Sequence, residues 1–260
     1  MTTYDYRKLV DDLTALLSDL PDEPAKPDGY SAHLLRKLRK DVCIAMDRLD
    51  KLSGVLDQVK KPEFVFDPSD PQRVGELISN TMLAQRKLPL AQVDKFWGAG
   101  VYAIYYNGDF DAYRPIKGTD HPIYVGKADP EDAHANTSED QGLKLTGRLL
   151  EHAKNIGKAS NLRLDDFHYR YLVVKSAWQK AAEDHLIKVY TPIWNNETGI
   201  CYGLGKHGDS AKTRANERSP WDMLHPGRIW ACDNKPNRKT VAQIKADIAE
   251  HFRLHPPIVD

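Results

Sequence analysis

Hydrophobic residues near the start of the chain recur at helical spacing. Between residues 3 and 20 they appear every three or four positions, as Tyr6, Val10, Leu13, Leu17 and Leu20. This spacing predicts an amphipathic helix. The next segment, residues 21–29, contains three prolines and a glycine, which end the helix. Its apolar stripe needs a partner surface to cover it.

A second, longer helix is predicted over residues 30–61. Its apolar residues occupy the a and d positions of consecutive heptads: Leu35, Leu38, Val42, Ala45, Leu49, Leu52, Leu56 and Val59. Such a stripe is typical of a helix that packs along another helix. Because consecutive elements are usually neighbours, we expect the two helices to form a hairpin. Pairing of the heptads in a dimer is the alternative.

The pattern changes after a proline-rich connector at residues 60–72. A short helix is predicted over 70–85, with Asp70 as its N-cap and Pro71 in its first position. The elements expected next are strands at 100–106, 122–127 and 167–175 and helices at 143–157 and 178–190. The order β-β-α-β-α indicates an α/β core. A short helix near 219–225 and an amphipathic helix at 240–253 follow.

These patterns suggest a division of the chain into four parts. A helical hairpin or coiled-coil extension covers residues 1–62, and a helical connector covers 63–97. The α/β core, with its loops, covers 98–231. A C-terminal helix and tail cover 232–260.

Charge narrows the class of protein only in part. The 260 residues carry no net charge, whereas proteins that bind nucleic acid non-specifically are usually basic. The charges are unevenly distributed, however. Residues 129–140 hold five acidic residues and no Lys or Arg, and residues 141–180 hold eight Lys or Arg against three acidic residues. A basic surface within a neutral total is compatible with this distribution.

The composition also indicates the cellular compartment in which we expect the protein. No apolar run approaches the roughly 18 residues of a membrane span, and the first residues lack the basic-then-apolar order of a signal peptide. We therefore expect no membrane association. Cys43, Cys201 and Cys232 are scattered, so neither a zinc site nor a disulfide framework is supported. An intracellular, reducing compartment is the expectation.

A set of polar residues at the edges of the core elements carries the candidate chemistry. Its members are Tyr102, Tyr124, Lys127, Arg148, His152, Glu183 and Asn195. Arg148 and His152 are four residues apart and share one face of the predicted helix. Cationic side chains can hold a phosphate, and a single Glu can bind a hydrated divalent cation. A phenol or imidazole can deprotonate water. Together these groups suit phosphodiester cleavage.

The same residues carry a resemblance to a known superfamily. The stretches "GVYAIYY" (100–106) and "PIYVGKA" (122–128) resemble the two halves of the GIY-YIG nuclease motif, and the order R-x₃-H, Glu, P-x-W-N follows as in that superfamily. The stretches "EHAKNIGKASNLRLDDF", "AAEDHLIKVYTPIWN" and "WDMLHPGRIWA" resemble the type II restriction endonucleases of this superfamily that cut CCGCGG. The resemblance covers about residues 96–231.

The resemblance implies an α/β (α+β) core with a mainly antiparallel three-stranded sheet flanked by helices. It further implies a homodimer that cuts double-stranded DNA at a palindromic, G·C-rich site, leaving 5′-phosphate and 3′-hydroxyl ends. Mg²⁺ would be the cofactor, and Mn²⁺ could substitute. A cognate DNA methyltransferase and the bacterial cytoplasm belong to the same expectation. The alternatives are a homing, repair or structure-specific nuclease, or a catalytically inactive DNA-binding protein of the same fold.

Roles for individual residues follow from the resemblance. Glu183 would hold the single metal ion, and Arg148 would stabilise charge on the transferring phosphoryl group. Tyr124 and Lys127 would contact the phosphate or the nucleophile. Asn195 would brace the site.

Two residues are candidates for the general base that takes the proton of the attacking water. Tyr102 would act as general base or position the water, and His152 would pair with Tyr102 or relay its proton. A phenol has an ordinary pKa of about 10 and is a poor base at neutral pH, although nearby cations favour the phenolate. The choice between Tyr102 and His152 therefore stays open from the sequence.

Residues that contact DNA outside the catalytic set are expected among the basic side chains of the core. Guanine is read in the major groove by Arg or Lys. The candidates are Lys154, Lys158, Arg163, Lys206, Lys212, Arg214 and Arg228, with the loop 203–214 ranked first. Most of these are expected to contact phosphate. Tyr105, Tyr106, Trp194 and Trp221 are interpreted as packing residues.

Overall fold

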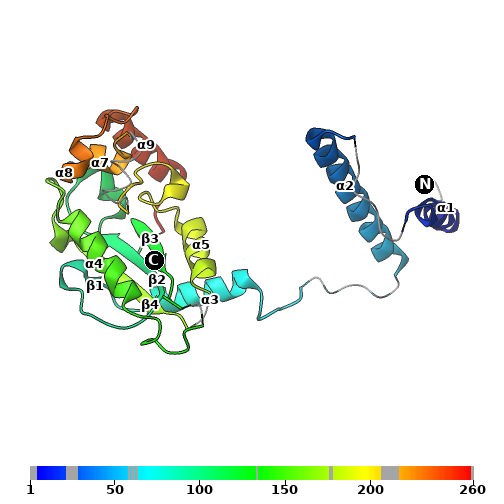
Figure 1. The fold of residues 1–260 in the computed structure, drawn as a ribbon, viewed down its shortest axis with the longest axis horizontal. Helices are drawn as coiled ribbons and strands as arrows, with labels where there is room; N and C mark the ends of the chain where they lie inside the picture. The colour runs from blue at the N-terminus through cyan, green and yellow to red at the C-terminus, as the bar shows by residue number, and fades with distance from the viewer. Residues whose placement is uncertain are drawn as a thin grey trace. The chain divides into compact units, whose positions relative to one another are not determined.

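The structure is a computed structural model that describes residues 5–21, 29–57, 59, 62, 64–132, 134–175, 178–205 and 217–258. The chain divides into two compact units, Met1–Val65 and Phe66–Asp260 (Figure 1). Each unit is described by itself below. Among the described residues, no helix is both long enough and apolar enough to cross a membrane.

The first unit contains the two helices predicted from the hydrophobic spacing. Helix α1 (Tyr6–Ser18) begins at Asp5, whose side chain accepts a hydrogen bond from the backbone of Lys8. Helix α2 (Ala32–Leu56) begins at Ser31, which caps it in the same way. The second helix was expected to reach residue 61, but Asp57 is already extended. Val59, the last predicted heptad position, therefore lies beyond it.

The second unit is built on an antiparallel sheet in the order β1-β4-β2-β3. Strand β2 (Gly100–Tyr106) lies between β4 (Phe167–Val173) and β3 (Tyr124–Ala128). These three strands confirm the expected sheet. Strand β1 (Leu88–Pro89) pairs with β4 and was not predicted, because two residues, one of them proline, are too short to show an alternating pattern.

Helices cover both faces of the sheet (Figure 1). Tyr102, Ile104 and Tyr106 point to the face covered by α4 (Lys144–Ile156), and Val101, Ala103 and Tyr105 point to the face covered by α3 (Pro71–Leu83) and α5 (Gln179–Tyr190). All residues of β2 are buried, as expected for a strand that is covered on both sides. The packing roles predicted for Tyr105 and Tyr106 are confirmed.

The C-terminal part closes one end of the core. It comprises α7 (Pro220–Leu224), α8 (Ile229–Cys232) and α9 (Val241–Leu254). The described residues also form the short 3-10 helices η1 (Leu90–Gln92), η2 (Asp111–Ile116), η3 (Leu164–Asp166) and η4 (Asn196–Thr198). Helix α9 begins with a capping box between Thr240 and Gln243, which satisfies two backbone donors at that end.

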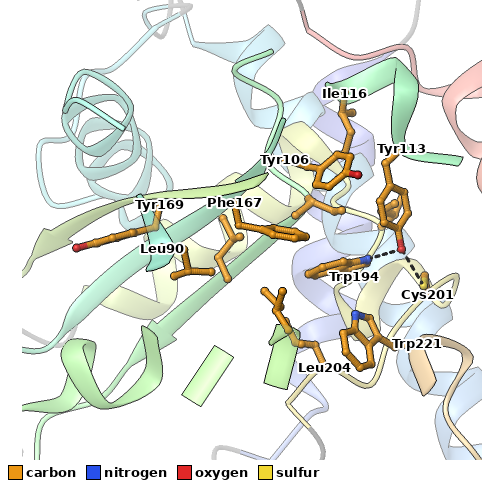
Figure 2. Packing of buried hydrophobic residues seen from close by; sticks show 14 of the residues in the cluster. Leu90, Tyr106, Tyr113, Ile116, Phe167, Tyr169, Trp194, Cys201, Leu204 and Trp221 are labelled. Carbon is orange, nitrogen blue, oxygen red and sulfur yellow. Dashed lines mark hydrogen bonds between the residues drawn. The ribbon is translucent and has the colours of Figure 1, made fainter. Parts of the chain in front are cut away.

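An aromatic cluster joins this end to the sheet. Figure 2 shows Trp194 between Tyr113 and Trp221, with its indole nitrogen donating a hydrogen bond to the Tyr113 hydroxyl at 2.9 Å. Trp194 and Trp221 are 1% and 0% exposed. Both are therefore packing residues, as predicted.

Candidate active site

The two motif tyrosines lie on neighbouring strands and share one face of the sheet. In the register of β2 and β3, Tyr102 pairs with Gly126 and Ile104 pairs with Tyr124. The ring centroids of Tyr102 and Tyr124 are 6.1 Å apart. A Cβ atom at Gly126 would lie 2.5 Å from the Tyr102 hydroxyl oxygen. The glycine of "YVG" is therefore needed to leave room for the first tyrosine.

Helix α4 brings His152 against both rings. The apolar side of this helix, which includes Leu149, packs on the sheet and carries His152 inward. Its Nε2 lies 2.7 Å from the Tyr102 hydroxyl, and its ring centroid lies 4.9 Å from that of Tyr124. Tyr102 and His152 are both 0% exposed. The three rings form one buried cluster.

Burial keeps this cluster neutral at ordinary pH. It lowers the pKa of His152 to about 3, and the charge of Arg148 acts in the same direction. Burial, and then Tyr124, raise the pKa of Tyr102 well above its usual value. Burial also raises the pKa of Tyr124, which Arg148 partly offsets. Within the described part of the chain, Nδ1 of His152 has no hydrogen-bond partner.

A cavity of about 350 Å³ opens beside the ring cluster. It is lined by Tyr124, Lys127, Ala128, Asp129, Lys144, Arg148 and Glu183. Four of the predicted catalytic residues are thus brought together around one space. Tyr102 and His152 do not line it, because they lie behind Tyr124.

The cations of the cavity have acidic neighbours. Lys127 forms an ion pair with Asp129, and Arg148 pairs with Glu151 at 3.0 Å. Lys144 pairs with Glu131 at 2.6 Å. Ion pairs that are this exposed contribute little to stability. A phosphate group entering the cavity can therefore replace the carboxylates as their partner.

Glu183 brings a half-buried carboxylate from α5 to the cavity. Burial raises its pKa, while the charge of Lys127 lowers it. Among the described residues, no group of three or more His, Cys, Asp or Glu side chains could hold a metal ion. A cation at Glu183 would therefore take its other ligands from water and substrate. This donor set fits a hydrated Mg²⁺-type ion and not a closed protein cage.

Asn195 supports the site from behind strand β3. Its side chain is 4% exposed, accepts a hydrogen bond from the backbone of Val125 at 2.9 Å and donates one to the carbonyl of the same residue at 2.8 Å. Val125 lies directly after Tyr124 and before Gly126. Asn195 therefore holds the strand that carries Tyr124, and both ends of its amide are occupied.

The predicted DNA contacts fall into three groups. Lys154, Lys158 and Arg163 are exposed. Lys206, Lys212 and Arg214 lie outside the described residues. The expectation for Arg228 is corrected in the next paragraph.

Arg228 is an interior residue. It is 1% exposed and pairs with Asp222 at 2.7 Å. Its two terminal nitrogens donate hydrogen bonds to the carbonyls of Leu204 and Gly203. The guanidinium is fully used inside the protein, so Arg228 is not a base-reading residue in this structure.

Two charged cavity residues were missed in the sequence. Lys144 lies four residues before Arg148 on the same helix, so it shares the face of Arg148, and this spacing could have revealed it. Asp129 begins the acidic segment that follows β3. Its position at the cavity depends on where the strand ends, which the acidic composition alone does not indicate.

A small antiparallel sheet with paired tyrosines, an Arg-and-His helix and a carboxylate on the next helix defines a GIY-YIG nuclease domain. The family model described as Eco29kI GIY-YIG domain matches residues 94–252. The chain belongs to this family of nucleases that act on DNA. No curated protein matches the chain significantly.

Proposed function

We propose that the chain is a restriction-type endonuclease that hydrolyses phosphodiester bonds of double-stranded DNA at the cavity beside Tyr124. The observation that carries this proposal is the arrangement around that cavity. Two carboxylates, three cations and one phenol face the same space of about 350 Å³. This combination provides a place for a phosphate, a metal ion and an attacking water.

The cations would bind the scissile phosphate. Arg148 presents a planar fork of donors that suits phosphate oxygens, and it is 40% exposed at its side chain. Lys127 and Lys144 approach from β3 and from the start of α4. Since charge builds up on the phosphoryl oxygens during displacement, fixed positive groups stabilise that state more than the ground state.

Glu183 would hold one Mg²⁺ ion, for which Mn²⁺ could substitute. A divalent ion bound there supplies Lewis-acid polarisation and lowers the pKa of bound water. The raised pKa of the Glu183 carboxyl reflects an environment that favours neutralisation of its charge, by a proton or by a cation.

The ring cluster would handle the proton of the attacking water. We assign direct contact with the water to Tyr124, because it is the ring of the cluster that lines the cavity. Tyr102 and His152 act behind it, as one hydrogen-bonded pair. The water oxygen bonds to phosphorus and gives up its proton to the Tyr124 oxygen, while Tyr124 passes its own proton through Tyr102 to Nε2 of His152. The bond from phosphorus to O3′ breaks, and O3′ leaves with the electron pair and takes a proton from a solvent water in the cavity. The products are a 5′-phosphate and a 3′-hydroxyl.

The expected target is a palindromic G·C-rich site, CCGCGG, cut by a homodimer with one cavity for each strand. This part of the proposal is supported by the resemblance of residues 151–167 and 221–231 to enzymes with that target. A DNA methyltransferase that protects the same site and a location in the bacterial cytoplasm belong to this proposal.

The deciding experiment incubates plasmid DNA with the full chain and Mg²⁺ and sequences the cut ends. Discrete fragments ending within CCGCGG support the proposal. Discrete fragments that end within another sequence would support the nuclease activity but overturn the proposed target site. Cleavage confined to branched or damaged DNA, or binding without cleavage, would replace the proposal by one of the two alternatives.

A further inference from the structure

Helices α1 and α2 leave apolar side chains in contact with water. Neither helix contains a buried residue. Along α2, Leu38, Val42 and Leu49 are 44%, 57% and 37% exposed. A contiguous apolar stripe on a protein surface marks an interaction site.

Part of this apolar stripe lines a groove between α1 and α2. This groove has a volume of about 890 Å³ and receives Tyr6, Leu9 and Leu13 from α1. Its other wall is α2, with Ala45, Leu49 and Leu52 inside and Asp41 and Arg48 also lining it. Helix α1 therefore leaves space beside the stripe, and this space is elongated along α2 because its lining residues extend over several turns.

We propose that the occupant of this groove is helix α2 of a second copy of the chain, running antiparallel. In antiparallel coiled coils each a residue faces a d residue of the other helix. With the two-fold axis near residues 43 and 44, the facing pairs are Leu35 with Leu52, Leu38 with Leu49 and Val42 with Ala45, each formed twice. Every layer of the interface is then apolar, as knobs-into-holes packing requires.

Charge complementarity selects this direction. In the antiparallel register Asp41 faces Arg48 of the second copy, and the pair is repeated by symmetry. Within the described part of the chain, neither side chain has an ion-pair partner of its own. In a parallel register, Asp41 would face Met46, and Arg48 would face Ser53. The parallel arrangement therefore forms no opposite-charge pair at these positions.

Apolar residues that flank the a and d positions of α2 also pair in this antiparallel arrangement. Leu34 and Val55 are 39% and 67% exposed, and the antiparallel register places them opposite one another. Helix α2 has 25 residues, or about 37 Å at 1.5 Å per residue. Tyr6, Leu9 and Leu13 from the α1 helices would cover the sides of the pair. This interface does not depend on the proposed nuclease activity.

The first test reverses charges in the full chain and measures the dimer dissociation constant by analytical ultracentrifugation. Asp41→Arg and Arg48→Asp should each raise that constant about tenfold, because each creates two like-charge contacts. The double variant should return to within about threefold of the original value. Single and double variants that dimerise alike would overturn the pairing. Both side chains are exposed, so folding should not be affected.

The second test determines direction by cross-linking. In a background with the exposed Cys43 and Cys232 replaced by serine, Leu34→Cys and Val55→Cys chains are expressed singly and together. A disulfide-linked dimer should form under mild oxidation only when the two variants are co-expressed. Cross-linking of either variant with itself, or absence of cross-linking in all three samples, would overturn the proposal.

The third test removes the apolar contact. Leu38→Glu combined with Leu49→Glu should give a monomer, whereas Leu77→Glu, at a leucine of α3 that is 67% exposed, should leave the dimer unchanged. Circular dichroism confirms that the variants fold. If the doubly substituted chain dimerises with the original affinity, the interface lies elsewhere. None of these measurements uses DNA, so they can fail or succeed independently of cleavage.

Discussion

The Tyr102 hydroxyl lies 2.7 Å from Nε2 of His152, and both side chains are completely buried. Neither group can reach a water in the cavity as the structure stands. In the proposed mechanism the pair therefore acts through Tyr124, whose ring lies 6.1 Å from Tyr102 and 4.9 Å from His152 between ring centroids. The question is therefore no longer whether Tyr102 or His152 contacts the attacking water, but whether Tyr124 does.

The first prediction separates the two tyrosines. Tyr124→Phe should lower the cleavage rate by about 10²-fold or more, because it removes the proposed proton acceptor, and should leave thermal stability nearly unchanged. Tyr102→Phe should also slow cleavage, and it should lower stability by about 1–3 kcal/mol, because Nε2 of His152 loses its buried partner. Single-turnover cleavage and urea denaturation measure both effects. A fully active Tyr124→Phe enzyme would contradict the direct role proposed for Tyr124.

The second prediction concerns Glu183 as the proposed metal ligand. Glu183→Gln should reduce Mg²⁺-dependent cleavage by at least about 10³-fold, since the charge that holds the ion is lost, while DNA binding measured without Mg²⁺ should remain. Asp184→Asn is the matched control, because Asp184 is the adjacent carboxylate and pairs with the exposed Lys180. Equal losses in both variants would argue against a special role for Glu183.

Much of this site could be predicted because its residues sit on regular elements. Strand alternation places Tyr102 and Tyr106 on one face of the sheet, and four-residue spacing places Arg148 and His152 on one face of a helix. These relations are local. The different exposure of Tyr102 and Tyr124 is not local, because it depends on β2 being central and β3 being an edge strand.

Arg228 shows why other positions could not be predicted. The sequence around it, HPGRIWA (225–231), is compatible with a DNA-contacting loop as much as with a buried one. Its burial depends on Asp222, six residues earlier, and on the carbonyls of Gly203 and Leu204, more than twenty residues earlier. Such partners are set by tertiary packing, and no local spacing indicates them.

The third prediction tests the interior role of Arg228. Arg228→Ala should destabilise the fold by about 3–5 kcal/mol, because it leaves the carboxylate of Asp222 buried without its partner. At a temperature where the variant is folded, the salt dependence of its DNA binding should match that of the original chain. Lys158→Ala should instead reduce the slope of that dependence by about one unit if this exposed lysine contacts phosphate. A reduced slope in the Arg228→Ala chain would contradict the interior role.

The fourth prediction treats Asn195 as a positioning residue. Asn195→Ala removes both hydrogen bonds to Val125 and should lower stability by about 2–4 kcal/mol. In the folded fraction kcat should fall more than KM rises, because Tyr124 loses its exact placement on β3. Asn195→Asp keeps the acceptor for the Val125 backbone and should restore part of the stability. A variant with normal kcat would show that β3 holds Tyr124 without Asn195.

The last prediction follows from His225, which is 0% exposed. Its Nδ1 lies 2.9 Å from Oδ1 of Asn161, and its Nε2 lies 2.5 Å from the Tyr113 hydroxyl, which suits a neutral ring. Burial lowers its pKa to about 3, whereas an unfolded histidine titrates near 6.5. Between these values the unfolded chain binds the proton and the folded chain does not, so stability is lost as pH falls. The loss is about 1.4 kcal/mol per pH unit for each such histidine.

Urea denaturation at pH 7 and pH 5 should show this loss of stability, and His225→Gln should make it smaller. His134→Gln, at an exposed histidine, should leave it unchanged. Equal slopes in all three proteins would contradict a neutral, buried His225.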